Sequence, residues 1–475
     1  MQLNTHEVVR HERGFCLIVP DLMTALDVSE DTTLLIDQAG HCRKEDLSDE
    51  SLGILRELKL LDYELPPEET QADNAIDIMK IALFVTQDCN FNCVYCYGAE
   101  EGGSIGGTYG SRGKMVPKTA AKAIDWLLDA SGDSPKVGIG FFGGEPFLNF
   151  PVIKQVVDYA NARAKEFNKT VDFNITTNGS LLNDDRIQFL KENNIYTTVS
   201  MDGGKRIQDK QRPLPNGKGT YEITAPKVKK LLKILPETVC RGTIFDDKDV
   251  EEAEAGLREM GFKSTYLTVA SPSLFSNSDN RDSEEPRFGV AREKARKEAK
   301  QLGEAIKLRD TGALEELKKS GTWASKITRF TQEFIYHQKR KFPCGAGRNY
   351  AGVSASGDIY PCHRLVGAKD QKIGSVFGGD VERSTFHRTT LGAEDGLNHC
   401  SDCFAKYVCA GGCHHDNLGA TGHVHGPDQE MCGLIRAVVQ EAAVLCSQMT
   451  ADERRFLVEE KIIQPPYCPQ DMFDT

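Results

Sequence analysis

Long apolar runs are missing from this chain of 475 residues. No stretch approaches the roughly 18 apolar residues from which a membrane-spanning helix is built. The N-terminus also lacks the apolar core of a secretory signal. We therefore expect a cytoplasmic protein with no membrane partner.

An excess of basic residues is missing as well. The chain has 58 Lys and Arg against 70 Asp and Glu, a net charge of −12. Nucleic-acid binding depends on cations that neutralise phosphates, so this balance argues against a nucleic-acid partner. The sequence contains no internal repeat or low-complexity tract, and its length alone predicts about three domains.

Cysteine, in contrast, is abundant, with 15 residues. Without a secretion signal, this number favours metal-bound thiols in a reducing compartment over disulfides. Ten of the cysteines fall into two groups with short spacings. The other five have separate, mostly apolar settings typical of packed thiols: Cys16, Cys42, Cys240, Cys446 and Cys468.

The first group is Cys89, Cys93 and Cys96, spaced Cys-x3-Cys-x2-Cys after an apolar run at 79–85 that predicts a buried strand. Active sites of parallel α/β folds lie at such strand ends. Soft thiolates bind zinc, Cu(I) or iron–sulfur clusters. A structural zinc site needs a fourth ligand, and the 40 residues after Cys96 contain no Cys or His. The pattern therefore favours a cluster with one open iron.

This triplet resembles that of the radical S-adenosylmethionine (SAM) superfamily, in which SAM chelates the open iron and is cleaved to a 5′-deoxyadenosyl radical. The resemblance implies that the three cysteines hold a [4Fe–4S] cluster and act in catalysis. Gly143-Gly144-Glu145-Pro146, after the apolar run at 137–142, resembles the element that holds the SAM amino group. Its glycines permit close approach of the backbone.

Further SAM contacts are implied by position in the same family. Tyr95 matches an aromatic residue near the adenine, while Asn178 and Ser200 match positions near the ribose and methionyl groups. Asp202 and Arg241, at predicted strand ends, would contact SAM or substrate, or else form a structural ion pair.

The second group places seven cysteines within 89 residues: Cys344, Cys362, Cys400, Cys403, Cys409, Cys413 and Cys432. Paired zinc ribbons are one interpretation. The full pattern, downstream of the triplet, resembles the SPASM extension of radical SAM enzymes, which holds two auxiliary [4Fe–4S] clusters. By position, Cys400, Cys403, Cys409 and Cys432 would bind the distal cluster, and Cys344, Cys362 and Cys413 the proximal one.

The proximal group departs from sulfatase-maturing relatives, which carry an eighth cysteine where this chain has Tyr350. One iron of that cluster would then stay open for a substrate thiolate. Arg212-Pro213 resembles a segment common in SPASM enzymes, so we group Arg212 with the cofactor-binding residues, although Gln208 replaces a histidine often found nearby. His414 and His415 are expected to donate hydrogen bonds around a cluster rather than to ligate it.

Strands and helices alternate from Met79 to about Ala270, with strands predicted at 79–85, 137–142, 171–175, 195–198, 238–245 and 264–269. Helices are predicted at 117–130, 151–166, 184–193, 221–235 and 249–260. Such alternation predicts an α/β fold of parallel units, and six of them match the partial (β/α)6 TIM-like barrel of the superfamily.

The remaining segments give the predicted domain order. Residues 1–75 form a winged-helix-like module that recognises a peptide, or else a cap on the barrel, and the barrel covers 76–271. A helical bridge at 272–341, a cluster domain at 342–446 and a tail at 447–475 with an irregular Pro465-Pro466 follow.

The resemblance implies a radical SAM peptide maturase that forms thioether crosslinks, of the ranthipeptide, sactipeptide or quinohemoprotein amine dehydrogenase maturase type. A glycine-rich insertion at 102–115 resembles a loop of such maturases. Implied partners are a precursor peptide or small protein and an electron donor such as flavodoxin or ferredoxin. Alternatives are residue oxidation, as in sulfatase maturases, carbon–carbon crosslinking, and a non-enzymatic iron–sulfur electron carrier.

Overall fold

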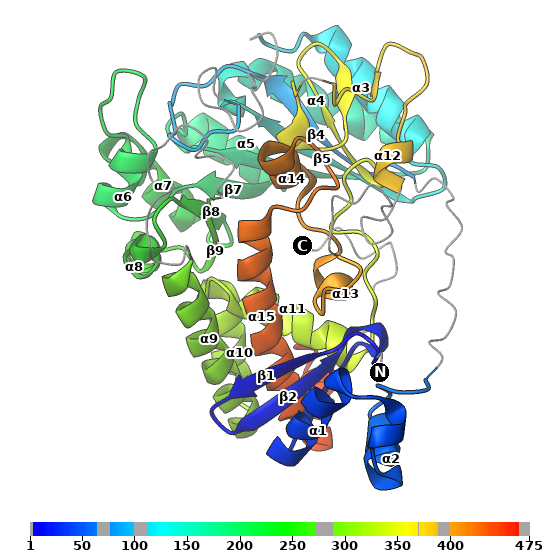
Figure 1. Cartoon of the computed structure of the whole chain (residues 1–475). Coiled ribbons are helices and arrows are strands. Elements are labelled where there is room, and N and C mark those ends of the chain that lie inside the picture. Colours follow the sequence, from blue (N-terminus) through cyan, green and yellow to red (C-terminus); the bar gives the residue numbers. More distant parts are fainter. Residues whose placement is uncertain are drawn as a thin grey trace.

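The structure is a computed structural model that describes residues 3–63, 77–98, 113–270, 288–368, 370–387 and 400–464. Figure 1 shows a large sheet with its helices at the top, a small N-terminal sheet at the bottom, and helix α15 between them. Within the described ranges, no helix is both long and apolar enough to span a bilayer.

The N-terminal sheet is antiparallel, in the order β1 (Glu7–His11), β2 (Gly14–Val19) and β3 (Thr24–Val28). Helices α1 (Glu30–His41) and α2 (Asp49–Glu57) follow, and each begins where a serine caps the first turn. Strand β2 is apolar on both faces. Leu17 and Val19 pack with the helices, whereas Cys16 and Ile18 belong to the main core of the protein. The small sheet therefore packs against the main hydrophobic core on one face and against its own helices on the other.

Six parallel strands, adjacent in the sheet and ending at one of its edges, form most of the large sheet and confirm the predicted α/β fold. They are β4 (Lys80–Thr86), β5 (Lys136–Gly143), β6 (Thr170–Thr177), β7 (Tyr196–Ser200), β8 (Val239–Ile244) and β9 (Ser264–Val269). The connecting helices are α3 (Pro117–Ala130), α4 (Phe150–Glu166), α5 (Asp184–Glu192), α6 (Lys205–Gln211), α7 (Tyr221–Ile234) and α8 (Val250–Met260). Because neighbours in the sheet follow the chain order, every strand ends at the same edge.

The large sheet continues beyond the six strands into the C-terminal region. Strand β10 (Tyr350–Val353) pairs in parallel with β4, and β11 (Asp358–Tyr360) and β12 (Gly374–Ser375) extend the sheet in antiparallel fashion. The two ends of this nine-stranded sheet are β12 and β9, so the barrel is open. The predicted cluster region is thus joined to the barrel by a shared sheet.

Helices complete the body between the two sheets. They are α9 (Gly289–Leu308), α10 (Thr311–Ser320), α11 (Ala324–Ile335), α12 (Ser384–His387), α13 (Lys406–Cys409), α14 (His414–Thr421), α15 (Gln429–Ser447) and α16 (Ala451–Glu459). Helix α15 packs against α9, α11 and the N-terminal sheet. Helix α16, which begins with a Thr450–Glu453 capping box, lies within the predicted tail. Pro465-Pro466 lies outside the described residues.

Candidate functional site

The triplet Cys89, Cys93 and Cys96 lies on the loop that leaves β4, at the edge where all six parallel strands end. The end of helix α6 supports this loop through backbone hydrogen bonds. The amide of Asn92 donates to Pro213 O at 2.8 Å, and that of Val94 donates to Gln211 O at 2.9 Å. The carbonyl groups of Gln211 and Pro213 therefore hold the residues on either side of Cys93.

Gly143 and Gly144 hold the other side of the loop by close backbone approach. The Gly144 amide donates to Thr86 O at 3.1 Å, and the Glu145 amide donates to Asp88 O at 2.9 Å. A Cβ on Gly143 would overlap the Thr86 carbonyl, and one on Gly144 would overlap the Asp88 carbonyl. Gly143 also has a φ of +139°, which favours glycine. Only glycine fits these two positions.

The Glu145 carboxylate is fully buried and links three backbone segments. It accepts hydrogen bonds from the amide of Phe147 at 3.2 Å, from the Thr177 hydroxyl at 2.8 Å and from the amide of Asn178 at 2.8 Å. Burial raises the pKa of Glu145, and the Asn178 amide opposes this. The protein thus occupies much, but not all, of the acceptor capacity that would hold the SAM amino group.

Asn178 joins the end of β6 to the cysteine loop. Its amide nitrogen donates to Asn90 Oδ1 at 2.9 Å, and Asn90 in turn donates to the Ser180 hydroxyl at 2.9 Å. Sequence reasoning did not single out Asn90, although its place directly after Cys89 was a usable signal. Ser200 ends β7 and pairs with Arg241 in the sheet. Arg241 was predicted at a strand end, but it is the third residue of β8, which continues to Ile244 because the pairing with β9 extends that far.

Tyr95, Asp202 and Arg212, all predicted to bind cofactor, form one buried network. The Tyr95 hydroxyl donates to Asp202 Oδ2 at 2.5 Å and accepts from Arg212 Nη1 at 2.6 Å. Gln211, which sequence reasoning missed, donates to Asp202 Oδ2 at 3.0 Å. Asp202 is 0% exposed. This network locks the tyrosine between two cysteines of the loop, and direct contact with SAM remains a prediction.

The thiols of the loop are suited to bind a cationic centre. Loss of hydration, followed by the neighbouring thiolates, raises the pKa of Cys93 to about 12. The pKa of Cys89 is raised to about 11 in the same way, although its side chain is reached by solvent. Metal binding requires thiolates, so a bound cluster would supply the missing positive charge. Three soft donors at one loop fit an iron–sulfur cluster. In the part of the chain that the structure describes, no Cys, His, Asp and Glu side chains converge on a single metal ion.

The thiols of the second group affect one another electrostatically within each of the two predicted sets. Burial, followed by the nearby thiols of Cys409, Cys432 and Cys403, raises the pKa of Cys400 to about 12. In the same way, burial and then Cys413 and Cys344 raise the pKa of Cys362 to about 12. The assignment of these seven cysteines to two clusters stays a prediction.

Aromatic and charged side chains fill the space between the loop and the three-thiol set. The Tyr350 hydroxyl lies 2.9 Å from His363 Nδ1, and the Tyr97 ring meets the His415 ring edge-on at 5.4 Å. Arg364 donates to Cys413 Sγ at 3.2 Å. These contacts agree with a supporting role for His415, and sequence reasoning missed Tyr97 and His363.

His414 Nδ1 lies 3.0 Å from Val424 O, so this ring nitrogen is occupied by the backbone. Of the five cysteines expected to be packed thiols, Cys16, Cys240 and Cys446 are buried. Cys42 is partly exposed, and Cys468 lies outside the described residues.

Two cations, Arg241 and Lys326, lie near each other and near cysteines of the second group. Burial and the like charge of Arg364 lower the pKa of Arg241 on β8. Burial, Arg329 and Arg241 lower the pKa of Lys326 on α11 to about 8. No carboxylate of the described ranges pairs with either side chain. Arg241 is nevertheless solvent-accessible, so an anionic part of a substrate can reach it.

Comparison with known proteins places these features in a family. Residues 83–272 match the radical SAM superfamily. An uncharacterized protein of Methanocaldococcus jannaschii is 38% identical over 144 residues, which are 30% of this chain and 45% of that protein. The cysteine-type anaerobic sulfatase-maturating enzyme of Clostridium novyi is 31% identical over 152 residues, 30% of this chain and 37% of that enzyme. The matched regions span less than half of either relative.

A solved structure extends the likeness of fold to the C-terminal region. The structure of anSMEcpe with bound AdoMet and the Kp18Cys peptide matches with a TM-score of 0.58 at 16% identity, over 76% of this chain and 96% of that chain. Residues 83–272 therefore form a radical SAM domain, and the fold of the chain, including segments beyond this domain, is similar to that of anSMEcpe.

Proposed function

We propose that this protein is a peptide maturase that links a cysteine of a ribosomally made peptide or small protein to one of its carbon atoms through a thioether. One observation carries the choice of bond. The three-thiol set of Cys344, Cys362 and Cys413 has Tyr350 beside it, where an eighth cysteine would close the set. A substrate thiol then has a position to occupy.

The chain's own residues supply binding and orientation. Cys89, Cys93 and Cys96 would hold the first [4Fe–4S] cluster, and the glycines and Glu145 would shape the SAM site. When bound, the cluster and SAM supply a one-electron route to a strongly hydrogen-abstracting carbon radical. We propose two auxiliary [4Fe–4S] clusters, a distal one at Cys400, Cys403, Cys409 and Cys432 and a proximal one at Cys344, Cys362 and Cys413.

The net reaction balances. The substrate carbon gives up one hydrogen atom, which ends in 5′-deoxyadenosine, and the substrate thiol gives up a proton to solvent. The substrate gives up one further electron, which returns to the redox groups of the protein as the C–S bond forms. Each SAM is cleaved to methionine and 5′-deoxyadenosine, and a carrier protein such as flavodoxin or ferredoxin supplies the starting electron.

We further propose that residues 1–75 recognise the substrate peptide and that the protein works in the cytoplasm, where thiols stay reduced. The N-terminal sheet has edge strands β1 and β3, and an extended peptide can add to such an edge. The anSMEcpe structure with a peptide supports a peptide substrate for this fold.

Mass spectrometry of a candidate peptide, taken from a neighbouring reading frame, tests the proposal. A thioether lowers the peptide mass by two hydrogens and removes one alkylatable thiol. A mass loss with every thiol still alkylatable would instead support residue oxidation or a carbon–carbon crosslink. The likeness to the Clostridium novyi enzyme favours residue oxidation as the second candidate. A pure electron carrier would form no 5′-deoxyadenosine.

Tyr350→Cys is expected to block thioether formation while 5′-deoxyadenosine still forms from SAM. The new thiol would lie near Cys344 and Cys362 and would close the three-thiol set. Crosslinked product, 5′-deoxyadenosine and the electron paramagnetic resonance spectrum of the reduced protein are measured together. Tyr350→Phe is the control, because it keeps the ring and adds no ligand. Normal crosslinking by the cysteine variant would contradict a role for the open position.

A further inference from the structure

We propose that the surface around the first turn of α3 is the docking site of an acidic one-electron carrier protein. This inference rests on the proposed function, which requires an electron donor. Two large apolar side chains mark the surface, since Val116 is 55% and Phe377 is 54% exposed. Phe377 and Thr119 of α3 both adjoin Gly357, where an added Cβ would lie 2.7 Å and 3.2 Å from them. Phe377 therefore lies near the first turn of α3, which Val116 directly precedes.

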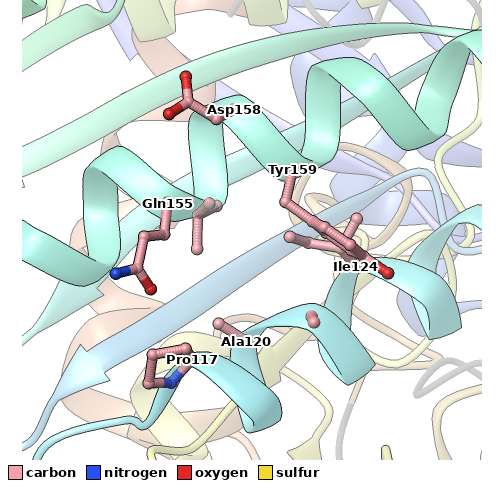
Figure 2. Close-up of a pocket in the computed structure, with 8 residues that line it drawn as sticks. Pro117, Ala120, Ile124, Gln155, Asp158 and Tyr159 are labelled. Atoms are coloured by element: carbon pink, nitrogen blue, oxygen red, sulfur yellow. The ribbon is translucent and has the colours of Figure 1, made fainter.

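A cavity of about 480 Å³ continues this patch between α3 and α4. Figure 2 shows side chains of the two helices on either side of it, with Pro117, Ala120 and Ile124 from α3 opposite Gln155, Asp158 and Tyr159 from α4. The α3 side is apolar and small-chained, so a protruding side chain of a partner can enter. Asp158 is the one acidic residue among those that line it.

Three lysines give the patch its charge. Lys114, Lys118 and Lys122 are exposed, and no carboxylate of the described segments pairs with them. Lys118 and Lys122 lie one turn apart on α3. The chain as a whole has a net charge of −12, so these lysines form a local excess of positive charge. They attract an acidic protein that comes within the Debye length, about 10 Å at moderate salt.

The patch adjoins the cysteine loop through short backbone links. Lys114 forms a bridge with Thr86, the Met115 amide donates to Val85 O at 2.9 Å, and the Gln87 amide donates to Gly113 O at 2.9 Å. Thr86 and Gln87 lead directly into Cys89. A helix that follows a parallel strand starts at the strand's carboxyl end, so the first turn of α3 lies on the side of the loop. An electron that enters here has a short bonded path to the triplet.

Charge and position favour a carrier over other occupants. A second copy would bring the same lysines to a two-fold interface, where they would repel one another. A substrate peptide must reach the barrel interior, whereas this patch lies on the outer helices. Acidic carriers present carboxylates around an exposed redox group, which complements apolar residues ringed by lysines.

The test compares two reductants in the formation of 5′-deoxyadenosine from SAM by the reconstituted full-length protein. Reduced flavodoxin must dock, whereas dithionite is small and need not. Lys118→Glu/Lys122→Glu is expected to raise the flavodoxin concentration for half-maximal rate by roughly tenfold and to leave the dithionite rate unchanged. Phe377→Ala should act in the same direction, and it keeps the charge.

Lys229→Glu/Lys233→Glu on α7 is the matched control, because it makes the same charge change on another exposed helix face. If the control also formed 5′-deoxyadenosine more slowly with flavodoxin, the docking site would be overturned. The same holds if the α3 variants lost activity equally with flavodoxin and with dithionite. An unchanged flavodoxin dependence in the α3 variants would overturn it too. Failure of every variant and of the unmodified protein to cleave SAM with dithionite would instead refute the proposed function.

Discussion

Gly144→Ala is expected to abolish SAM cleavage and most iron binding. The added Cβ would overlap the carbonyl group of Asp88 and approach the amide of Cys89, and both are backbone groups. The Cys89 loop must then move away from β5, and forcing atoms into a packed site costs about 1–3 kcal/mol. Anaerobic reconstitution followed by iron and sulfide analysis, and assay of 5′-deoxyadenosine, measure the effect.

Gly113→Ala is the control for this variant. Gly113 accepts the hydrogen bond of the Gln87 amide beside the same loop, yet nothing lies within 4 Å of an added Cβ there. It should bind iron and cleave SAM normally. If Gly144→Ala also retained full iron content and activity, close packing of the two loops would not be needed for the site.

Asp202→Ala is expected to destabilise the fold by about 3–5 kcal/mol, because it leaves a buried arginine without its carboxylate. Asp202 Oδ1 lies 3.6 Å from Arg212 Nη1, and the two side chains are 0% and 10% exposed. The Tyr95 hydroxyl and the Gln211 amide would lose their acceptor as well. Denaturant unfolding of the protein measures the loss.

A double-mutant cycle separates the pair from the rest of the network. Arg212→Met removes the charge and keeps much of the side-chain volume, so Asp202→Ala should cost markedly less in that background. Iron content gives a second readout, since the network holds Tyr95 between Cys93 and Cys96. Equal costs in both backgrounds would show that the ion pair does not hold the loop.

Much of the fold could be predicted from patterns along the chain. Apolar runs such as 137–142 predicted strands, and periodic segments such as 117–130, which begins with a proline, predicted helices, because the spacing of apolar side chains reflects which face is buried. The short strands β10, β11 and β12 escaped prediction. Each is too short to show a period, and β10, on which the other two depend, pairs with a partner about 270 residues away, since Tyr350 pairs with Lys80.

The residues of the candidate site likewise include some that could be predicted from the sequence and some that could not. Cysteine spacing indicated the two groups of thiols, because ligands from one loop must lie close in sequence to reach one cluster. Gln211 and Asn90 were missed, since a neutral amide has no spacing rule, and its role depends on the buried carboxylate or loop that it meets. The lysines near Val116 likewise gain significance only where Phe377 lies beside them.

The sequence by itself determined the chemistry: ten cysteines in two spaced groups and a glycine-rich turn after the second barrel strand. Only the tertiary structure decided how these parts support one another. It joined β10 to β4, locked Tyr95 between Asp202 and Arg212, and packed the N-terminal sheet on α15. The physical reason is that spacing along a chain sets the donor atoms a loop can offer, whereas contacts between distant segments arise only when apolar faces are buried together.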